Sequence, residues 1–476
     1  MLIAIRVQVD DGREIARVID ARYSSWHTSS SHSDNIPPFV SIIMTRPSLS
    51  AVVCLASVFF SSANAENWIG WRGPRGDGSS LETRVPTQWD GATGKNILWK
   101  VQIPGEGHAS PIIWEDRIFV VSCLPGEKQR VLICLDRASG KTLWQKAVMS
   151  APLETKHSLN SFASGTPATD GKLVYVTFLE VDGSTVPAPN VGTPRPITPG
   201  EMVVAAYDFD GNRKWMVKPG SFVSAHGFCS SPVLYKNSVI VNGDHDGDSY
   251  VVALDRETGE TLWKVDRQHK TRSYVTPIIR EAAGRTQMVM SGSKCIVSYD
   301  PNNGKQHWEI DGPTEQFVAS MVFDGNLFFM TAGFPYHHVM GIRPDGTGLV
   351  TDTHVAWHQT SAKCYVPSPV VLDGYLIVAD DGGTANCFDA ATGEPLWKER
   401  LGKHFSASLI HANGLAYLIA DDGITTIVRP GKKLDIIAKN PLGEYSFASP
   451  ALSDGQLFIR GENNLYCIEE QTAAGN

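Results

Sequence analysis

The chain has 476 residues, of which 42% are hydrophobic and 19% are charged, a composition that excludes a disordered chain and a bundle of membrane helices. Its net charge of −8 argues against a basic surface for nucleic acid, so no nucleic-acid partner is expected. Gly (43) and Pro (28) are frequent, which favours many short strands joined by tight turns.

The N-terminal region predicts an export signal that begins inside the chain. Residues 44–65 contain Arg46, an apolar stretch over 49–60 and an Ala-x-Ala exit before Glu66, which are the parts of a secretory signal peptide. The alternative is a buried core strand or helix. Residues 1–43 would bury the signal, so we interpret them as an over-long start, a non-native or disordered extension.

The apolar stretch also limits the relation to a membrane. It is shorter than the roughly 20 residues that a spanning helix needs, and no other apolar run is longer. Cys54 lies within the stretch and Glu66 follows the cut, so the cysteine of a lipid anchor is missing. We therefore expect a periplasmic or secreted protein that neither spans a membrane nor carries a lipid anchor.

One phrase recurs along the rest of the chain: a strand ends in Asp, a turn with Gly follows, and the next strand carries Trp. Clear copies cover 135–144, 254–263 and 388–397, and looser copies cover 207–215 and 299–308. Asp can bond the backbone of the turn, Gly supplies its positive φ, and Trp is large enough to wedge between neighbouring sheets. We predict that the following tryptophans dock one blade on the next: Trp99, Trp144, Trp215, Trp263, Trp308, Trp357 and Trp397.

A second phrase alternates with the first. It consists of a Ser or Thr, usually followed by Pro, then an apolar strand, a turn and a β-branched strand. Pro is tolerated at the first residue of a strand, and an Asp-Gly turn joins the two strands of the last copy. The copies begin at Ser110, Thr166, Ser231, Thr276, Ser320, Ser368, Ser408 and Ser449. Eight copies predict eight four-stranded units.

The ends of the repeat region predict how the units are arranged. The last unit lacks a Trp-bearing strand, whereas the strand over 97–101 has no partner before it. We therefore predict an all-β fold, an eight-bladed β-propeller of four-stranded antiparallel blades whose ring is closed by the N-terminal strand completing the last blade. Closure leaves only short, protected edges, in contrast to the alternative of an open array of hairpins. The propeller is expected over residues 89–476, after a lead-in segment over residues 66–88.

Three cysteines occupy the same place in different repeats, two residues before an acidic residue: Cys134, Cys387 and Cys467. Equivalent positions in separate blades cannot easily meet. We expect small buried apolar residues rather than disulfide partners.

The two phrases together resemble the PQQ-type propeller repeat, over nearly the whole chain from residue 89 to about 470. Two groups share this repeat: quinoprotein dehydrogenases, and non-enzymatic propellers similar to the BamB-like component of the outer-membrane β-barrel assembly machinery. The lead-in Trp68–Pro74 also resembles a segment that precedes many exported propellers of this kind. The resemblance implies the fold and leaves the function open between the two groups.

Two sets of loops are expected at one mouth of the central channel. The loops that enter the innermost strands carry about one aromatic residue or His per blade, which either packs between blades or forms a stacking ring for a flat ligand or an extended peptide. These candidate ligand-binding residues are His108, Phe162, His226, Tyr274, Phe317, Tyr365, Phe405 and Tyr445.

The loops after the second strands are acidic. Asp244, Asp246 and Asp248 alternate along one of them, so their oxygens could face one hard cation such as Ca²⁺. The distant Glu of an EF-hand loop is missing, and the alternative is a solvated, turn-forming loop. These residues are the candidate metal ligands, with Ca²⁺ as the candidate ion.

The resemblance implies two different functions. Dehydrogenases of the family hold PQQ in the channel and Ca²⁺ beside it, use a catalytic Asp and often have a vicinal Cys pair. No two cysteines are adjacent in this sequence, and the Ca²⁺ ligands and the catalytic Asp map onto no matching positions. We therefore predict no catalytic residue, and PQQ is not expected as a cofactor.

The favoured prediction is an exported, monomeric, non-enzymatic propeller that acts as a binding or assembly scaffold for a protein or glycan. One alternative is a PQQ- and Ca²⁺-dependent quinoprotein dehydrogenase. The other is a propeller that binds a carbohydrate or a small ligand at the aromatic mouth.

Overall fold

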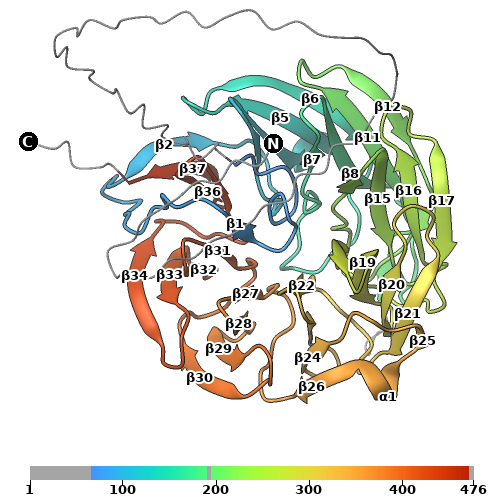
Figure 1. The fold of residues 1–476 in the computed structure, drawn as a ribbon. Coiled ribbons are helices and arrows are strands. Elements are labelled where there is room, and N and C mark those ends of the chain that lie inside the picture. Colours follow the sequence, from blue (N-terminus) through green and yellow to red (C-terminus); the bar gives the residue numbers. More distant parts are fainter. Residues whose placement is uncertain (1–65, 190–194, 471–476) are drawn as a thin grey trace, which may run out of the picture. The chain divides into compact units, whose positions relative to one another are not determined.

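Eight sheets follow one another around a central channel as the blades of a propeller (Figure 1). The computed structural model describes residues 66–189 and 195–470. The extension predicted over residues 1–43 and the signal peptide predicted over residues 44–65 lie outside the described residues. The predicted eight-bladed propeller of four-stranded antiparallel blades is confirmed.

The first four blades each take four consecutive main strands, from the channel outward. Blade one consists of β3 (Ile112–Trp114), β4 (Arg117–Leu124), β5 (Gln129–Asp136) and β6 (Thr142–Ser150). Blade two consists of β7 (Ala168–Thr169), β8 (Leu173–Val181), β11 (Gly200–Asp208) and β12 (Arg213–Val217). Blade three consists of β14 (Val233–Tyr235), β15 (Ser238–Gly243), β16 (Tyr250–Asp255) and β17 (Thr261–Asp266). Blade four consists of β18 (Ile278–Ala282), β19 (Arg285–Gly292), β20 (Cys295–Tyr299) and β21 (Gln306–Asp311).

The remaining blades follow the same order, except that the outer strand of the last comes from the N-terminal part of the chain. Blade five consists of β22 (Val322–Phe323), β23 (Phe328–Ala332), β24 (His338–Ile342) and β26 (Val355–Gln359). Blade six consists of β27 (Val370–Leu372), β28 (Tyr375–Ala379), β29 (Thr384–Asp389) and β30 (Pro395–Arg400). Blade seven consists of β31 (Ile410–Ala412), β32 (Leu415–Ile419), β33 (Ile424–Arg429) and β34 (Asp435–Pro441). Blade eight consists of β35 (Ala451–Ser453), β36 (Gln456–Arg460), β37 (Asn464–Glu469) and β2 (Ile97–Gln102).

Strand β2 pairs antiparallel with β37, so segments from the two ends of the propeller lie side by side in one sheet (Figure 1). The remaining short elements decorate the blades. They are β1 (Ser79–Ser80), which pairs parallel with β31; the ribbon β9 (Val186–Pro187) with β10 (Pro196–Ile197); β13 (Ser221–Phe222) on β11; β25 (Gly348–Leu349) on β21; the helix α1 (Thr351–His354); and a 3-10 turn at Pro125–Glu127.

The recurrent Asp and Gly build the turn between the third and fourth strands. In blade three, Oδ1 of Asp255 accepts hydrogen bonds from the backbone N–H groups of Glu257 and Thr258, both at 2.9 Å. Gly259 has φ +79°, and a Cβ atom there would lie 2.8 Å from the ring of Trp215 in blade two. The glycine is therefore needed for the turn and for the approach of the neighbouring blade.

Most of the seven tryptophans join their own blade to the next. Six donate the indole N–H to a backbone oxygen of the following blade, at 2.8–3.2 Å: Trp99 to Arg137, Trp144 to Phe209, Trp215 to Arg256, Trp263 to Pro301, Trp357 to Ala390 and Trp397 to Gly431. Trp308 differs, because its indole donates to Oε1 of Gln287 within its own blade, at 2.7 Å.

The Ser and Thr residues of the second phrase link the innermost strands around the channel. In six pairs, the backbone N–H of one of these residues donates a hydrogen bond of 2.9–3.1 Å to the hydroxyl oxygen of its counterpart in the next blade. The donors and acceptors are Ser110 to Thr166, Thr166 to Ser231, Thr276 to Ser320, Ser320 to Ser368, Ser368 to Ser408 and Ser408 to Ser449. We call these residues the hydroxyl ring. The second phrase marks these positions in the sequence, and their restriction to Ser and Thr is the signal for this role.

The hydrophobic core lies between neighbouring blades. Tyr175 of blade two and Val241 of blade three, for example, belong to one buried cluster. Cys134, Cys387 and Cys467 are fully buried and unpaired, as expected. No helix in the described part of the chain is long and apolar enough to cross a bilayer.

Candidate functional site

The lead-in segment runs across one end of the channel and contacts several blades. Its backbone oxygens at Trp68, Ile69 and Gly78 accept hydrogen bonds of 2.8–2.9 Å from the innermost strands of blades one, two and seven. Trp71 donates its indole N–H to Oγ of Ser320 in the hydroxyl ring, at 3.3 Å. Residues 68–78 therefore form a floor at this end.

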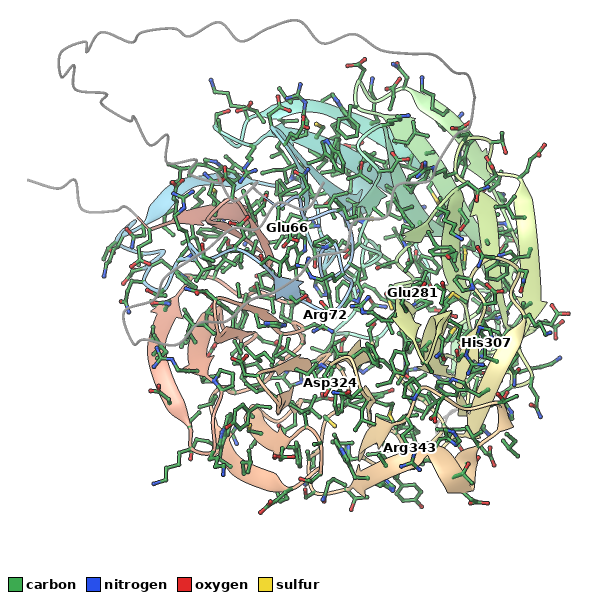
Figure 2. All side chains as sticks on the ribbon, viewed as in Figure 1. Glu66, Arg72, Glu281, His307, Asp324 and Arg343 are labelled. Atoms are coloured by element: carbon green, nitrogen blue, oxygen red, sulfur yellow. The ribbon has the colours of Figure 1, made fainter. Side chains whose placement is uncertain are left out.

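Arg72 fixes this floor to the propeller. The side chain is fully buried near the middle of the ring (Figure 2), and it donates to the backbone oxygens of Pro369 and Leu409 at the entrances to blades six and seven. Burial lowers the pKa of Arg72 to about 10, so the guanidinium is still charged at neutral pH. Nearby, Asp77 of the same segment pairs with Arg280 of blade four at 2.5 Å.

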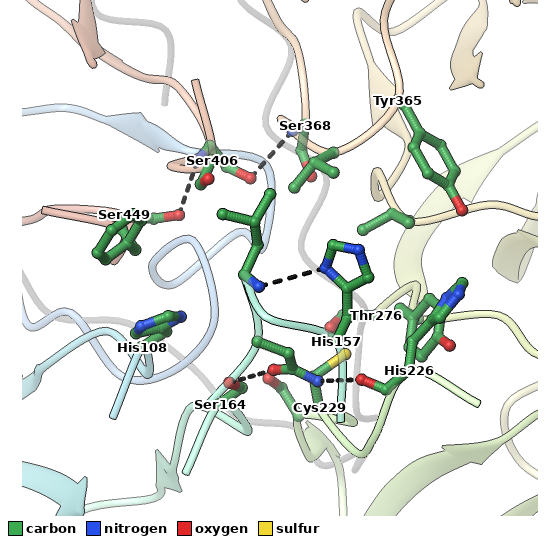
Figure 3. Close-up of a pocket in the computed structure, with 18 of the residues that line it drawn as sticks. His108, His157, Ser164, His226, Cys229, Thr276, Tyr365, Ser368, Ser406 and Ser449 are labelled. Atoms are coloured by element: carbon green, nitrogen blue, oxygen red, sulfur yellow. Dashed lines mark hydrogen bonds between the residues drawn. The ribbon is translucent and has the colours of Figure 1, made fainter. Parts of the chain in front are cut away.

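A cavity of about 300 Å³ lies in the channel (Figure 3), and Trp71 of the floor is one of the residues that line it. Its wall is built from the loops between blades, which carry aromatic and imidazole rings, and from members of the hydroxyl ring. Cys229 also lines it. A volume of this size is at the lower end of that of small-molecule sites.

Stacked rings form two parts of the wall. His108 stacks on Phe447, with ring centroids 4.7 Å apart and planes at 28°. His226 stacks on Tyr274, with centroids 6.0 Å apart and planes at 28°. Figure 3 shows His108 on one side of the cavity, with His226 and Tyr365 on the other.

The wall carries little charge. Burial lowers the pKa of His108 to about 4 and that of His226 to about 3, so both imidazoles are neutral at physiological pH. Asp381 supplies the carboxyl group of the wall. It accepts a hydrogen bond of 3.0 Å from the backbone N–H of Val366, and burial raises its pKa. Among the described residues that line the cavity there is no Lys or Arg.

The eight predicted mouth residues are distributed over three environments. His108, His226, Tyr274 and Tyr365 line the cavity. Phe317 and Phe405 are buried in the core between blades, and Phe162 is half-buried, with Nζ of Lys156 4.9 Å from its ring centroid. Tyr445 is 57% exposed and stacks on Phe447 at 6.5 Å. Packing between blades thus accounts for some of the set, and the cavity brings together the others.

Several residues of the cavity were missed by sequence reasoning. Phe447, His157 and Asn160 line it, and Trp71 forms its floor. The alternation of Tyr445 and Phe447 along an extended loop was a signal that Phe447 belongs to the cavity. The positions of His157 and Asn160, in the long connection over 151–167, follow from a loop conformation that has no sequence period.

The three aspartates of the predicted cation site have separate partners. Asp244 pairs with buried Arg267 (Oδ1–Nε 3.0 Å), Asp246 with buried Arg272 (Oδ1–Nη1 2.6 Å), and exposed Asp248 with Lys270 (Oδ1–Nζ 2.5 Å). Burial of Arg267 opposes the charge of its guanidinium, but the neighbouring Asp244 carboxylate holds the pKa of Arg267 well above its ordinary value. Across residues 66–189 and 195–470, no three or more His, Cys, Asp or Glu side chains are grouped as metal ligands. The alternation seen in the sequence thus produces ion pairs here.

The geometry defines a class: an eight-bladed β-propeller with PQQ-type repeats and a cavity in its channel. A family model described as outer membrane protein assembly factor BamB matches residues 82–186, 127–331 and 349–434, more than half of the chain. The chain belongs to this family.

Solved structures with the same fold include BamB and two dehydrogenases. BamB from Moraxella catarrhalis matches with a TM-score of 0.54 and 13% identity, over 78% of this chain and 99% of that one. A europium-containing methanol dehydrogenase matches with a TM-score of 0.55 and 13% identity, over 84% of this chain and 90% of that one. Quinohemoprotein alcohol dehydrogenase from Comamonas testosteroni matches with a TM-score of 0.56 and 11% identity, over 86% of this chain and 81% of that one. Identities this low show the fold alone, and no curated protein matches the sequence significantly.

Proposed function

We propose that this propeller is exported to the cell envelope and acts there as a non-enzymatic, monomeric binding or assembly scaffold. The observation that carries the proposal is the asymmetry of the channel, which is floored by the lead-in segment at one end and carries exposed aromatic residues at the other. Tyr336 and Tyr445 are 68% and 57% exposed. Large aromatic side chains that are exposed at one face are typical of surfaces that bind another protein.

The family supports the same proposal. Its description names an assembly factor of the outer membrane, which fits a protein that works through contacts with others. The export signal predicted over residues 44–65 would bring the chain to that compartment.

The residues of the cavity do not fit PQQ. This cofactor carries several carboxylate groups, and transfer of such charges to a buried site that has no cationic partner is strongly disfavoured. The cavity wall offers no Lys or Arg within the described chain and adds a carboxyl group of its own at Asp381. We derive no reaction step through PQQ.

The proposal can be tested by site-specific crosslinking in the organism that makes the protein. A photoreactive residue replaces Tyr336 or Tyr445 at the mouth, and Glu257, which is exposed on a turn at the opposite face, serves as the matched control. We expect both mouth positions to give the same crosslinked partner and Glu257 to give none. Equal crosslinking from all three positions, or from none, would contradict a scaffold that uses this face.

A second experiment separates the scaffold from an enzyme. The chain beginning at Glu66 is stripped of metal, titrated with PQQ with and without Ca²⁺ by calorimetry, and assayed with alcohols and a dye acceptor. We expect neither binding nor dye reduction. Ca²⁺-dependent binding with dye reduction would replace the scaffold by a quinoprotein dehydrogenase.

A further inference from the structure

We infer that the channel cavity binds an uncharged compound of one or two fused rings that carries hydrogen-bond acceptor oxygens. The inference rests on the proposed role of the propeller as a binding protein and adds a ligand class for the cavity. The shape, the charge and the free hydrogen-bond donors of the wall each favour such a ligand.

The shape of the wall favours a ring. The His108–Phe447 and His226–Tyr274 stacks line the cavity with aromatic and imidazole rings from different loops. Tyr274 is held in place by a hydrogen bond of 2.8 Å between its hydroxyl and Oγ of Ser224. Rigid aromatic walls bind flat rings with little loss of conformational entropy.

The charge of the wall favours a neutral molecule. An anionic ligand would lose its hydration and meet Asp381, with no Lys or Arg along the described wall to pair with it. An ion transferred to such a site without a partner is strongly disfavoured. His108 and His226 do not supply a positive charge at neutral pH, because burial lowers the pKa of both imidazoles.

The floor side of the cavity offers hydroxyl donors. Ser231, Ser368, Ser408 and Ser449 line the cavity, and each accepts a backbone N–H of the preceding blade through Oγ. A hydroxyl that accepts one hydrogen bond keeps its own O–H donor. Within the described residues, none of these four hydroxyls donates to a protein acceptor, so they can donate to oxygens on the edge of a bound ring.

Three probes of similar outline separate these features. Coumarin has two fused rings with acceptor oxygens, coumarin-3-carboxylate adds a negative charge, and naphthalene lacks the oxygens. With the chain beginning at Glu66, calorimetry should detect coumarin binding. The carboxylate should bind at least roughly tenfold more weakly because of its unpaired charge, and naphthalene roughly two- to tenfold more weakly because it accepts no hydrogen bond.

Variants show whether the probes bind in the cavity. Tyr274→Leu removes the stacked ring and should weaken coumarin binding roughly two- to tenfold, whereas Tyr274→Phe keeps the ring and should not. Leu262→Ala, on the outer strand β17 and 45% exposed, is the control and should leave binding unchanged.

Each outcome decides one claim. If coumarin-3-carboxylate binds as well as coumarin, the inference of an uncharged ligand is wrong. If none of the probes binds, or if Tyr274→Leu has no effect, the cavity is not the ring-binding site that we infer. Neither result affects the crosslinking from Tyr336 and Tyr445, which tests the scaffold proposal independently.

Discussion

Single hydroxyl groups of the innermost strands connect neighbouring blades. The stability of the fold should therefore respond to the loss of a single oxygen atom from one of them. The oxygen of Ser408 accepts the backbone N–H of Ser368, and both residues are buried. A donor that is buried without an acceptor costs more than an average hydrogen bond contributes.

We therefore expect Ser408→Ala to lower the free energy of unfolding by about 1–3 kcal/mol. Ser453→Ala is the matched control, because Ser453 is equally buried and its hydroxyl has no partner in the described chain. Loss of this unpaired hydroxyl should leave the free energy of unfolding unchanged or raise it, because the buried O–H group has no hydrogen bond to lose. Urea unfolding of both variants measures the difference, and equal losses would show that the ring bond contributes nothing.

A half-buried histidine at the floor, His411, should make stability depend on pH. Burial lowers the pKa of His411 to about 4, whereas an unfolded histidine titrates near 6.5. Between these values the unfolded chain binds more protons than the folded chain. Stability is therefore retained above about pH 6.5 and falls as the pH falls, by about 1.4 kcal/mol per pH unit for this group.

The corresponding variant is His411→Gln, which cannot take up the proton. Between pH 7.5 and pH 5, its urea midpoint should fall less than that of the unchanged protein. If both midpoints fall in parallel, the proton uptake of the unfolded state comes from other groups.

At the scale of the element, a turn and a tryptophan from different blades form one structural unit. Gly259 and Gly284 both lie in turns with positive φ, at +79° and +74°. Only at Gly259 would a Cβ atom meet a neighbouring side chain, the ring of Trp215 at 2.8 Å, whereas nothing lies within 4 Å at Gly284.

Gly259→Ala and Gly284→Ala should therefore differ in a defined way. Both introduce a side chain in the left-handed region, which costs about 1–2 kcal/mol. Gly259→Ala should lose about 1–3 kcal/mol more, because the blade interface becomes overpacked. Equal unfolding midpoints in urea would mean that the interface adapts freely to the added methyl group.

Elements were predictable where the repeat phrase was intact. Its Asp, Gly and Trp each act on nearby backbone or on the adjacent blade, so the strands on either side of the turn could be inferred from the sequence. Blade five departs from the phrase: β25 and α1 lie between β24 and β26. The ribbon β9–β10 was not predicted either, because it extends a loop rather than a repeat.

For the whole molecule, the N-terminal strand and the lead-in segment have separable roles. Strand β2 covers the edge of β37, and an uncovered edge is open to pairing with another chain. The segment over 68–78 closes the channel and binds the innermost strands.

Two truncations should separate these roles. A chain that begins at Pro86 loses the floor but keeps β2, and it should remain a folded monomer of lower stability. A chain that begins at Pro104 also loses β2 and should associate or aggregate through β37. Size-exclusion chromatography with light scattering distinguishes them, and a soluble monomer from the second chain would contradict the role given to β2.

The sequence by itself determined the blades, because the turn chemistry and the strand pattern act over short distances and the second phrase repeats eight times. It also indicated the buried state of Cys134, Cys387 and Cys467, since equivalent positions in separate blades cannot meet.

Only the tertiary structure decided the site. His108 and Phe447 stack although the chain separates them by most of its length. Asp244 and Asp246 pair with Arg267 and Arg272 of the loop between β17 and β18. Loop residues have no period that fixes their direction. Which side chains face the cavity, and which face the core, is therefore settled by the packing of neighbouring blades and of the lead-in segment against the channel.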